Sequence, residues 1–159
     1  MNKKTRFLTE GALIAALYVV LTYITSIAGL ASGAVQVRIS EALCILPAFT
    51  FSAVPGLFVG CLAANLLTGA ALWDIVFGAM ATLLGAAGTY LWGKNAFKAT
   101  VFPIVSNTVI IPFVLKMAYG VEQGYIFLVL SILAGEVISC GVLGGFLYSG
   151  LKKTKLFVK

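Results

Sequence analysis

Charged residues are sparse along this chain, and the long apolar stretches between them predict its architecture. Apart from Glu136, the longest charge-free stretches are residues 11–37, 42–73, 75–93, 99–115 and 123–151. A membrane-spanning helix needs about 20 mostly apolar residues, so four of these stretches predict one such helix each. The stretch 42–73 is too long for one ordinary helix and short for two. Pro55-Gly56 inside it is a strong turn signal, which favours a hairpin of two short helices.

The distribution of Lys and Arg decides between five and six membrane crossings, because cytoplasmic loops are rich in these residues. With six crossings, nine of the eleven basic residues lie in the cytoplasm and only Arg38 and Lys116 lie outside. With five crossings, four lie inside and seven outside. We therefore expect an all-α integral membrane protein with six transmembrane helices, both termini cytoplasmic, no N-terminal signal peptide, and one domain over residues 1–159. The expected spans are residues 8–29, 41–53, 55–70, 74–93, 99–117 and 124–151.

Composition agrees with a membrane protein and excludes several kinds of chemistry. Hydrophobic residues make up 61% of the 159 residues and charged residues 10%, with a mean hydropathy of +1.07, whereas soluble domains are about 25% charged. The net charge of +6 gathers on the expected cytoplasmic side, so it does not indicate nucleic-acid binding. Histidine is absent, which removes His-based triads and most catalytic metal sites. Cys44, Cys61 and Cys140 lie in apolar stretches without CxxC spacing, so we expect buried small hydrophobic residues and no metal or cofactor site.

The rare polar residues of the apolar stretches gather, in this topology, between the outer membrane surface and the midplane. Glu136 lies about 18 Å below the outer end of the last span, where a carboxyl group costs roughly 2.5–3.5 kcal/mol or more. Such a group usually faces a cavity, a partner or a substrate. The candidate binding residues are Gln36, Arg38, Glu41, Asn65, Asp74, Asn107 and Glu136. Their shared depth indicates a pocket that opens to the outside.

Each of these residues also has a purely structural explanation. Asp74 would be favoured as a cap at a helix N-terminus. Arg38 and Glu41, three positions apart, could pair with each other. Glu136 could be paired with Arg38 or be protonated. The two asparagines could join neighbouring helices through hydrogen bonds, and Gln36 could be solvated in a loop.

Small residues recur four positions apart on the first and last expected spans, a spacing that lets helices approach closely. The pairs are Gly11 with Ala15, Ala12 with Ala16, and Gly141 with Gly145. These pairs are explained either by packing within the chain or by docking of a partner subunit.

Three segments together resemble the QueT family, and the resemblance covers essentially the whole chain. They are QVRISEAL at 36–43 (followed by Pro47), GCLAANL at 60–66 and DIVFG at 74–78. QueT-like proteins are regarded as substrate-binding S components of energy-coupling factor (ECF) transporters. The resemblance implies a six-helix protein of the bacterial cell membrane that takes up a queuosine precursor, a deazaguanine base such as queuine or its aminomethyl or cyano relatives.

The resemblance also implies partners. S components dock onto a transmembrane coupling subunit through an Ala-xxx-Ala motif on the first helix, and Ala12 and Ala16 fit that motif. The sequence has no GxxxxGK[ST] motif, so ATP would be bound by the two ATPases of the complex. In the family mechanism the loaded S component topples in the membrane and releases its substrate inside.

A deazaguanine ligand suits the candidate residues chemically. A carboxylate accepts the adjacent N–H donors of a guanine edge, and we expect Glu136 or Glu41 in this role. The ligand carbonyl and ring nitrogen need donors, for which the candidates are Asn107, Gln36 and Arg38. An aminomethyl group would be cationic, and Asp74 is the candidate for it. The aromatic residues considered for stacking on the base are Trp73, Tyr90 and Tyr125.

Three other functions compete with this interpretation. An intramembrane enzyme is disfavoured because the chain has no His and a single Asp. A secondary transporter driven by protons through Glu136 would take up substrate without an ATPase. An S component for another vitamin would share the fold, and only the three sequence segments favour the deazaguanine.

Overall fold

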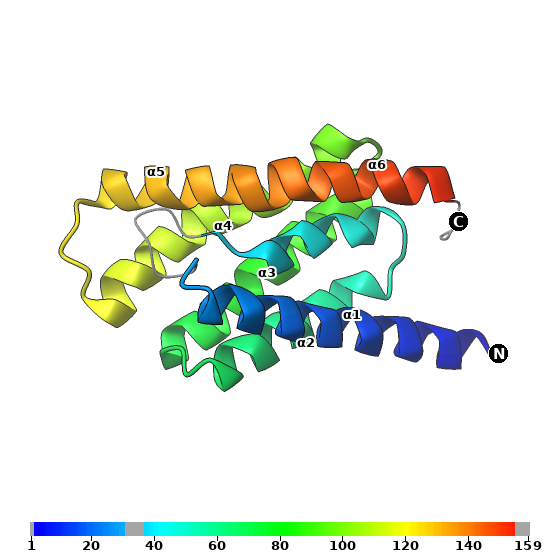
Figure 1. The fold of residues 1–159 in the computed structure, drawn as a ribbon, viewed down its shortest axis with the longest axis horizontal. Coiled ribbons are helices and arrows are strands. Elements are labelled where there is room, and N and C mark those ends of the chain that lie inside the picture. The colour runs from blue at the N-terminus through cyan, green and yellow to red at the C-terminus, as the bar shows by residue number, and fades with distance from the viewer. Residues whose placement is uncertain (1, 31–36, 155–159) are drawn as a thin grey trace.

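The computed structural model describes residues 2–30 and 37–154, and every regular element in these two ranges is a helix. In chain order the elements are α1 (Lys3–Ile27), η1 (Ile39–Ala48), α2 (Ala53–Leu67), α3 (Leu72–Trp92), α4 (Ala96–Tyr119), α5 (Tyr125–Glu136), η2 (Val137–Leu143) and α6 (Gly144–Thr154). η1 is a 3₁₀-helix and η2 is a π-helix, which joins α5 and α6 into one helix of 30 residues. The segments run to and fro between two ends of the molecule, and the first and last described residues lie at the same end (Figure 1).

Four of the helices are long and apolar enough to cross a membrane: α1, α3, α4 and the continuous helix Tyr125–Thr154. These four confirm the expectation of a multi-pass membrane protein. η1 has ten residues and α2 has fifteen, so they reach about 20 Å and about 22 Å, less than a hydrocarbon core of about 30 Å. The count of six crossings therefore stays a prediction. Most of η1 is buried by other helices, which shields its irregular backbone from lipid.

The turn between the two short helices is not at Pro55-Gly56, as the sequence pattern predicted. It lies at residues 49–52, and Pro55 is the third residue of α2. Proline is tolerated in the first helical turn because the N–H it lacks would have no partner there. Gly56 is used for packing, since a Cβ on it would lie 2.7 Å from the carbonyl oxygen of Gly11 on α1.

The two small-residue pairs of α1 face different surroundings. Gly11 and Ala15 contact α2, where a Cβ on Gly60 would lie 3.0 Å from the Cα of Ala15. This pair thus packs within the chain. Ala12 and Ala16 are exposed on the outer face of α1.

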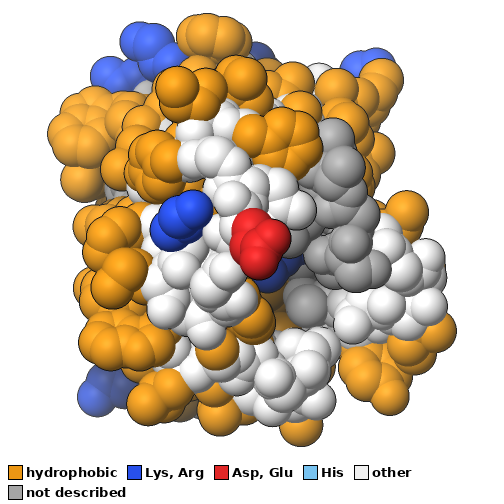
Figure 2. Space-filling model, turned by 90° about the vertical axis from the view of Figure 1, so that its left-hand side faces the viewer, with side chains coloured by type: hydrophobic (Ala, Val, Ile, Leu, Met, Phe, Trp, Pro, Cys, Tyr) orange, Lys and Arg blue, Asp and Glu red, His pale blue; other side chains and the backbone are white. Residues whose placement is uncertain are grey.

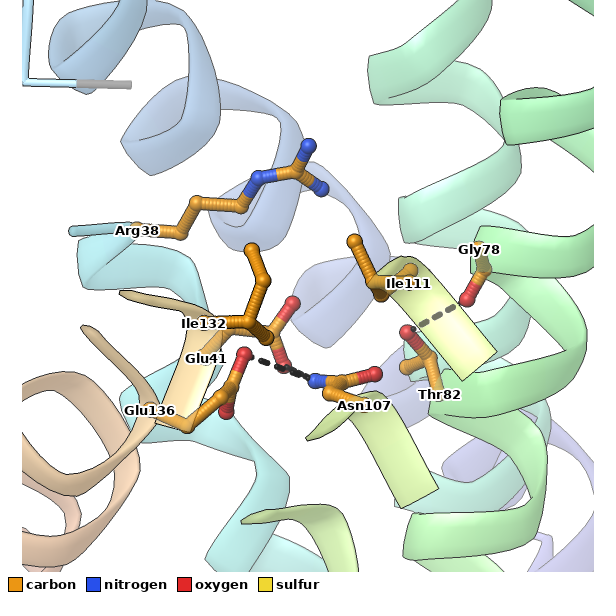
Figure 3. Close-up of a pocket in the computed structure, with 8 residues that line it drawn as sticks. All are labelled: Arg38, Glu41, Gly78, Thr82, Asn107, Ile111, Ile132 and Glu136. Carbon is orange, nitrogen blue, oxygen red and sulfur yellow. Dashed lines mark hydrogen bonds between the residues drawn. The ribbon is translucent and has the colours of Figure 1, made fainter. Parts of the chain in front are cut away.

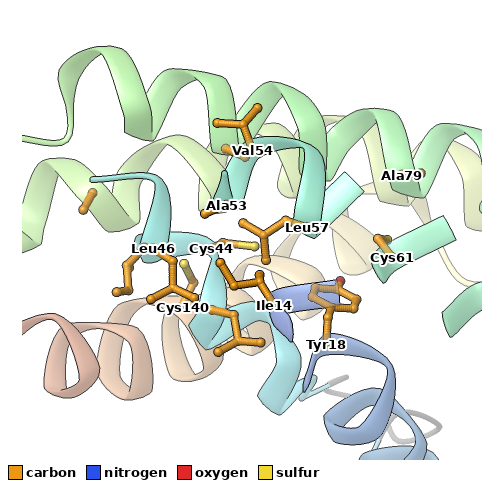
Figure 4. Close-up of a cluster of buried hydrophobic side chains, with 14 of the residues drawn as sticks. Ile14, Tyr18, Cys44, Leu46, Ala53, Val54, Leu57, Cys61, Ala79 and Cys140 are labelled. Carbon is orange, nitrogen blue, oxygen red and sulfur yellow. The ribbon is translucent and has the colours of Figure 1, made fainter. Parts of the chain in front are cut away.

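The main core lies where α1, η1 and α2 meet α3 and η2 (Figure 4). Its largest fully buried side chains include Tyr18, Ile45 and Leu57. The three cysteines lie among them as free, buried thiols, which confirms their prediction as core residues. Lipid tails are as apolar as this core, so tight van der Waals contact rather than removal from water holds the helices together.

Candidate functional site

A small, partly open cavity lies between η1, α3, α4 and the α5–η2 junction. Its walls are formed by Arg38, Glu41, Gly78, Thr82, Asn107, Ile111, Ile132 and Glu136. Figure 3 shows the Asn107 amide directed toward the two glutamates, with Arg38 on the other side of them. The cavity holds about 20 Å³, which is room for about one water molecule. We call it the inner cavity.

The two glutamates of the inner cavity share one amide donor. Asn107 Nδ2 lies 2.9 Å from Oε1 of Glu136 and 3.3 Å from Oε2 of Glu41, and donates to both. Glu41 also accepts from the hydroxyl of Tyr18 at Oε1 and from the thiol of Cys44, 3.1 Å away, at Oε2. Both oxygens of Glu41 are therefore engaged within the protein.

Glu136 is bonded differently from Glu41. It is 8% exposed, and its Oε2 has no hydrogen-bond partner among the described residues. A buried, unpartnered polar atom is uncommon in a native protein and calls for an explanation. This oxygen is free to accept an N–H group from a ligand, or the carboxyl group is free to carry a proton.

A second and larger cavity lies beside the first, toward the end of the molecule opposite the termini. It is lined by Thr22, Thr25, Ser26, Arg38, Asn65, Thr68, Gly69, Ala70, Asp74 and Tyr119. Its volume is about 290 Å³, close to the lower limit of small-molecule sites, about 300 Å³. Its walls are about half polar, with hydroxyl, amide and carboxylate groups. We call it the outer cavity.

Asp74 is the acidic group of the outer cavity. Its Oδ2 accepts a hydrogen bond of 3.1 Å from the hydroxyl of Tyr119 and lies 3.9 Å from Nη2 of Arg38. Its Oδ1 is buried and has no hydrogen-bond partner in the described ranges 2–30 and 37–154. Asn65 donates to the backbone carbonyl of Asp74 over 3.2 Å, so α2 holds the start of α3 in place.

Arg38 belongs to both cavities and separates them. It precedes η1, and its backbone N–H donates to Oγ of Ser139 in η2 over 3.1 Å. Its side chain lines both cavities, and its ion pair is with Asp74, at 3.9 Å. Among the residues that the structure describes, Arg38 is the one that lines both cavities.

Irregular helices carry the two glutamates. Glu41 is in the 3₁₀-helix η1, and Glu136 is the last residue before the π-helix η2. The two irregular segments contact each other. Short 3₁₀ and π segments are often found at functional sites, because they turn side chains away from the regular helical positions.

The structure brings together the predicted site residues that it describes. Arg38, Glu41, Asn107 and Glu136 line the inner cavity, and Asn65 and Asp74 line the outer cavity with Arg38. Gln36 lies outside the described residues.

The geometry also bears on the structural explanations of three of these residues. Asp74 lies in the first turn of α3, where the helix dipole favours a carboxylate, and it accepts a hydrogen bond from Tyr119. Arg38 is paired with Asp74 and not with Glu41 or Glu136 in the part of the chain that is described. Asn65 does join two helices, as the structural explanation proposed.

Other residues of the site were not predicted from the sequence. Tyr18, Cys44 and Ser139 bond the predicted residues, and Tyr119 is the aromatic residue of the outer cavity. Trp73, Tyr90 and Tyr125, considered for stacking, do not line either cavity. The unpredicted residues are ordinary members of apolar helices, and only the depth and face of their helices make them neighbours of the charged groups.

The surface of the molecule agrees with a site buried between membrane helices. Figure 2 looks onto the end opposite the termini, where hydrophobic side chains form the margins and polar groups and backbone occupy much of the centre. Large apolar side chains such as Ile126 and Phe146, 76% and 75% exposed, cover the sides of the helices. Fold and site together define a multi-pass membrane protein with polar cavities in its interior.

The chain belongs to the QueT transporter family. The family profile described as QueT transporter matches residues 8–153, which include both cavities and nearly all of the helices. No curated protein and no solved structure matches the chain. The family is that of a transporter, so the cavities lie in a protein that moves a solute across a membrane.

Proposed function

We propose that this chain is the substrate-binding S component of an ECF transporter and that it captures a queuosine precursor, a deazaguanine base, from outside a bacterial cell. Membership of the QueT transporter family supports the transporter class. The observation that carries the ligand class is the buried Glu136 carboxyl group, whose Oε2 has no partner among the described residues while its Oε1 accepts from the Asn107 amide. A carboxylate accepts the N–H edge of a guanine-like ring, and an amide supplies the complementary donor.

In this proposal Glu136 accepts the guanine edge, because the oxygens of Glu41 already accept from three protein donors. Arg38 donates to the ligand carbonyl or ring nitrogen, and Asn107, whose two N–H groups bond the two glutamates in the empty chain, does so by giving up its longer bond to Glu41. The substrate enters through the outer cavity, past Asp74 and Asn65, and joins the two cavities when Arg38 moves aside. Gln36 stays a candidate donor at the entrance.

Calorimetric binding to the purified, detergent-solubilised chain tests the substrate class. The ligands are queuine and the aminomethyl and cyano deazaguanine bases, with guanine, riboflavin and thiamine as controls. Tight binding of deazaguanines alone is expected, and E136Q should weaken it about 10- to 100-fold, the range for a hydrogen bond to a charged group. Glu122→Gln, at an exposed acidic residue before α5, is the matched control and should bind normally.

Other results would redirect the proposal. Binding heat from riboflavin or thiamine, with none from a deazaguanine, would leave the transporter class standing and contradict the proposed substrate. Full deazaguanine affinity in Glu136→Gln would remove Glu136 from the site. Uptake driven by a proton gradient without any ATPase would favour a secondary transporter.

We propose that the partners are a transmembrane coupling subunit and two ATPases, with both termini of this chain in the cytoplasm and no nucleic acid involved. Ala12 and Ala16 support docking on α1, because they are exposed while the neighbouring small pair is used for internal packing. Leucine at both positions should abolish co-purification with the coupling subunit and leave ligand binding intact. Gly145→Leu, where an added Cβ meets nothing within 4 Å, is the matched control. Equal co-purification of the Ala12/Ala16 variant would place the docking surface elsewhere.

A further inference from the structure

An open apolar groove runs along the surface of the α1–α2 pair, away from both interior cavities. Its floor is made of small residues, Gly11, Ala12 and Ala15 of α1 and Gly56 of α2. The two helices approach so closely that a Cβ on Gly56 would lie 2.7 Å from the carbonyl oxygen of Gly11. Because the floor has almost no side chains, the groove holds about 250 Å³ of open space, and its walls are almost wholly apolar.

Larger apolar side chains form the rim of this groove and extend it toward the end that holds the termini. Leu8 and Val59 on the rim are 68% and 54% exposed. Phe7 stacks on Phe51, with ring centroids 5.9 Å apart, which holds this part of the rim in place. Phe7 and Leu8 also line a second apolar hollow of about 400 Å³, so the groove and the hollow are continuous.

Two lysines, Lys3 and Lys4, line the far end of the groove, where α1 extends past the start of α2 (Figure 1). Both are exposed, and neither makes an ion pair within the described ranges 2–30 and 37–154, whereas the nearby Arg6 is paired with Glu10 at 2.7 Å. From Lys4 to Ala15 the groove spans about 16 Å, about one leaflet of a hydrocarbon core that is about 30 Å thick. The groove is therefore apolar over the depth of a leaflet and cationic where that leaflet ends.

We infer that, in the chain outside any complex, this groove binds an anionic phospholipid, with one acyl chain along the floor and the phosphate beside Lys3 and Lys4. A flexible acyl chain restores the van der Waals contacts that the lining of an open groove lacks. Every lipid tail offers this, so the selection of one lipid comes from the attraction of the lysines for a negative headgroup. Lysine stems lie along apolar surface while their ammonium groups stay at headgroup level. Of the described residues, none that lines this groove lines an interior cavity, so the lipid site is separate from the solute site.

Native mass spectrometry of the full-length chain, in a neutral detergent at low salt, tests this site. The probes are phosphatidylglycerol, which is anionic, and phosphatidylcholine with identical acyl chains, which has no net charge. We expect the unmodified chain to bind phosphatidylglycerol about 30-fold tighter, from about fivefold for each lysine. Lys3→Gln with Lys4→Gln should abolish this preference. Lys152→Gln with Lys153→Gln, at exposed positions in the last turn of α6, is the matched control and should preserve it.

A second variant tests the floor of the groove. Ala12→Leu places a larger side chain there and should weaken the binding of both lipids by a similar factor, with the headgroup preference unchanged. Ala12 is exposed, so the leucine does not disturb the core. Gly145→Leu, where an added Cβ meets nothing within 4 Å, is the matched control and should bind both lipids as the unmodified chain does.

Three results would overturn the inference. Equal binding of the two lipids to the unmodified chain would remove the anionic site, and this comparison does not require any variant to fold. A preference that persists in the Lys3/Lys4 variant would place the headgroup elsewhere. Unchanged lipid affinity in Ala12→Leu, together with lost co-purification of the coupling subunit, would assign the groove to that subunit. The proposed transport function is tested separately, since no solute is present in this experiment.

Discussion

Glu10 and Glu136 are both glutamates within long apolar helices, and the structure treats them in opposite ways. Glu10, near the end that holds the termini, has a donor for each oxygen: Arg6 at 2.7 Å on Oε1, and Thr50 at 3.0 Å and Ser52 at 2.9 Å on Oε2. Its side chain is also 24% exposed.

Glu136 has one donor, Asn107, and one buried oxygen without any among the described residues. Three donors supplied by the chain make Glu10 a structural clamp between α1 and the turn at 49–52. The missing donor at Glu136 leaves an interaction for a ligand to complete. The contrast therefore separates an acidic group that holds the fold from one that serves a site.

Removal of the Asn107 amide, which bonds both Glu41 and Glu136, should have the largest effect on stability and ligand binding. Asn107→Leu deletes the described donor of Glu136 and one donor of Glu41, and brings an apolar group between two carboxylates. We expect unfolding in detergent to become easier by about 2–4 kcal/mol, since two buried polar groups lose a partner, and ligand binding to be lost.

The control for this variant is Thr82→Val in the same cavity, whose hydroxyl donates to the carbonyl of Gly78 in its own helix at 3.1 Å and bonds neither glutamate. Its thermal unfolding should differ little from that of the unmodified chain. An Asn107→Leu protein as stable as the Thr82→Val protein would show that the hydrogen bonds from Asn107 to the two glutamates are not required for stability.

Neutralising Glu136 sharpens the comparison, because stability and binding should move in opposite directions. In Glu136→Gln a buried carboxyl group beside Glu41 is replaced by an amide that cannot carry a charge, so the ligand-free protein should gain about 1–2 kcal/mol of unfolding free energy. Thermal unfolding with and without the deazaguanine ligand measures both quantities. A variant that loses stability even without ligand would make Glu136 a structural residue like Glu10.

The sequence predicts the polar groups of the site better than their geometry. Charge gaps and basic-residue placement predict the helical segments, and burial of carboxylates in an apolar chain points to Glu41, Asp74 and Glu136. These signals work because a charge in a membrane is too costly to occur without a role.

The same signals fail for η1 and η2, because the local sequence does not show whether a helix winds as 3₁₀, α or π. They also fail for Tyr18 and Tyr119, whose hydroxyl groups bond Glu41 and Asp74 although tyrosine occurs throughout apolar helices. Glu10 gives no such signal because it lies next to the charged N-terminal segment, and its hydroxyl donors come from a turn that the sequence pattern predicts elsewhere.

Of the three substitutions, neutralising Glu10 should have the smallest effect on stability and ligand binding. Glu10→Gln weakens bonds to three donors, but the group is partly exposed and Arg6 is solvated, so a loss of about 1 kcal/mol in unfolding free energy is expected. Ligand affinity should not change, since the clamp is at the end opposite the outer cavity. Ser52→Ala removes one of the same bonds, and its effect should add little to that of Glu10→Gln if the two residues act as one unit. If the losses of unfolding free energy in Glu10→Gln and Ser52→Ala add fully in the double variant, or if ligand affinity falls, Glu10 is not a clamp that stabilises the fold alone.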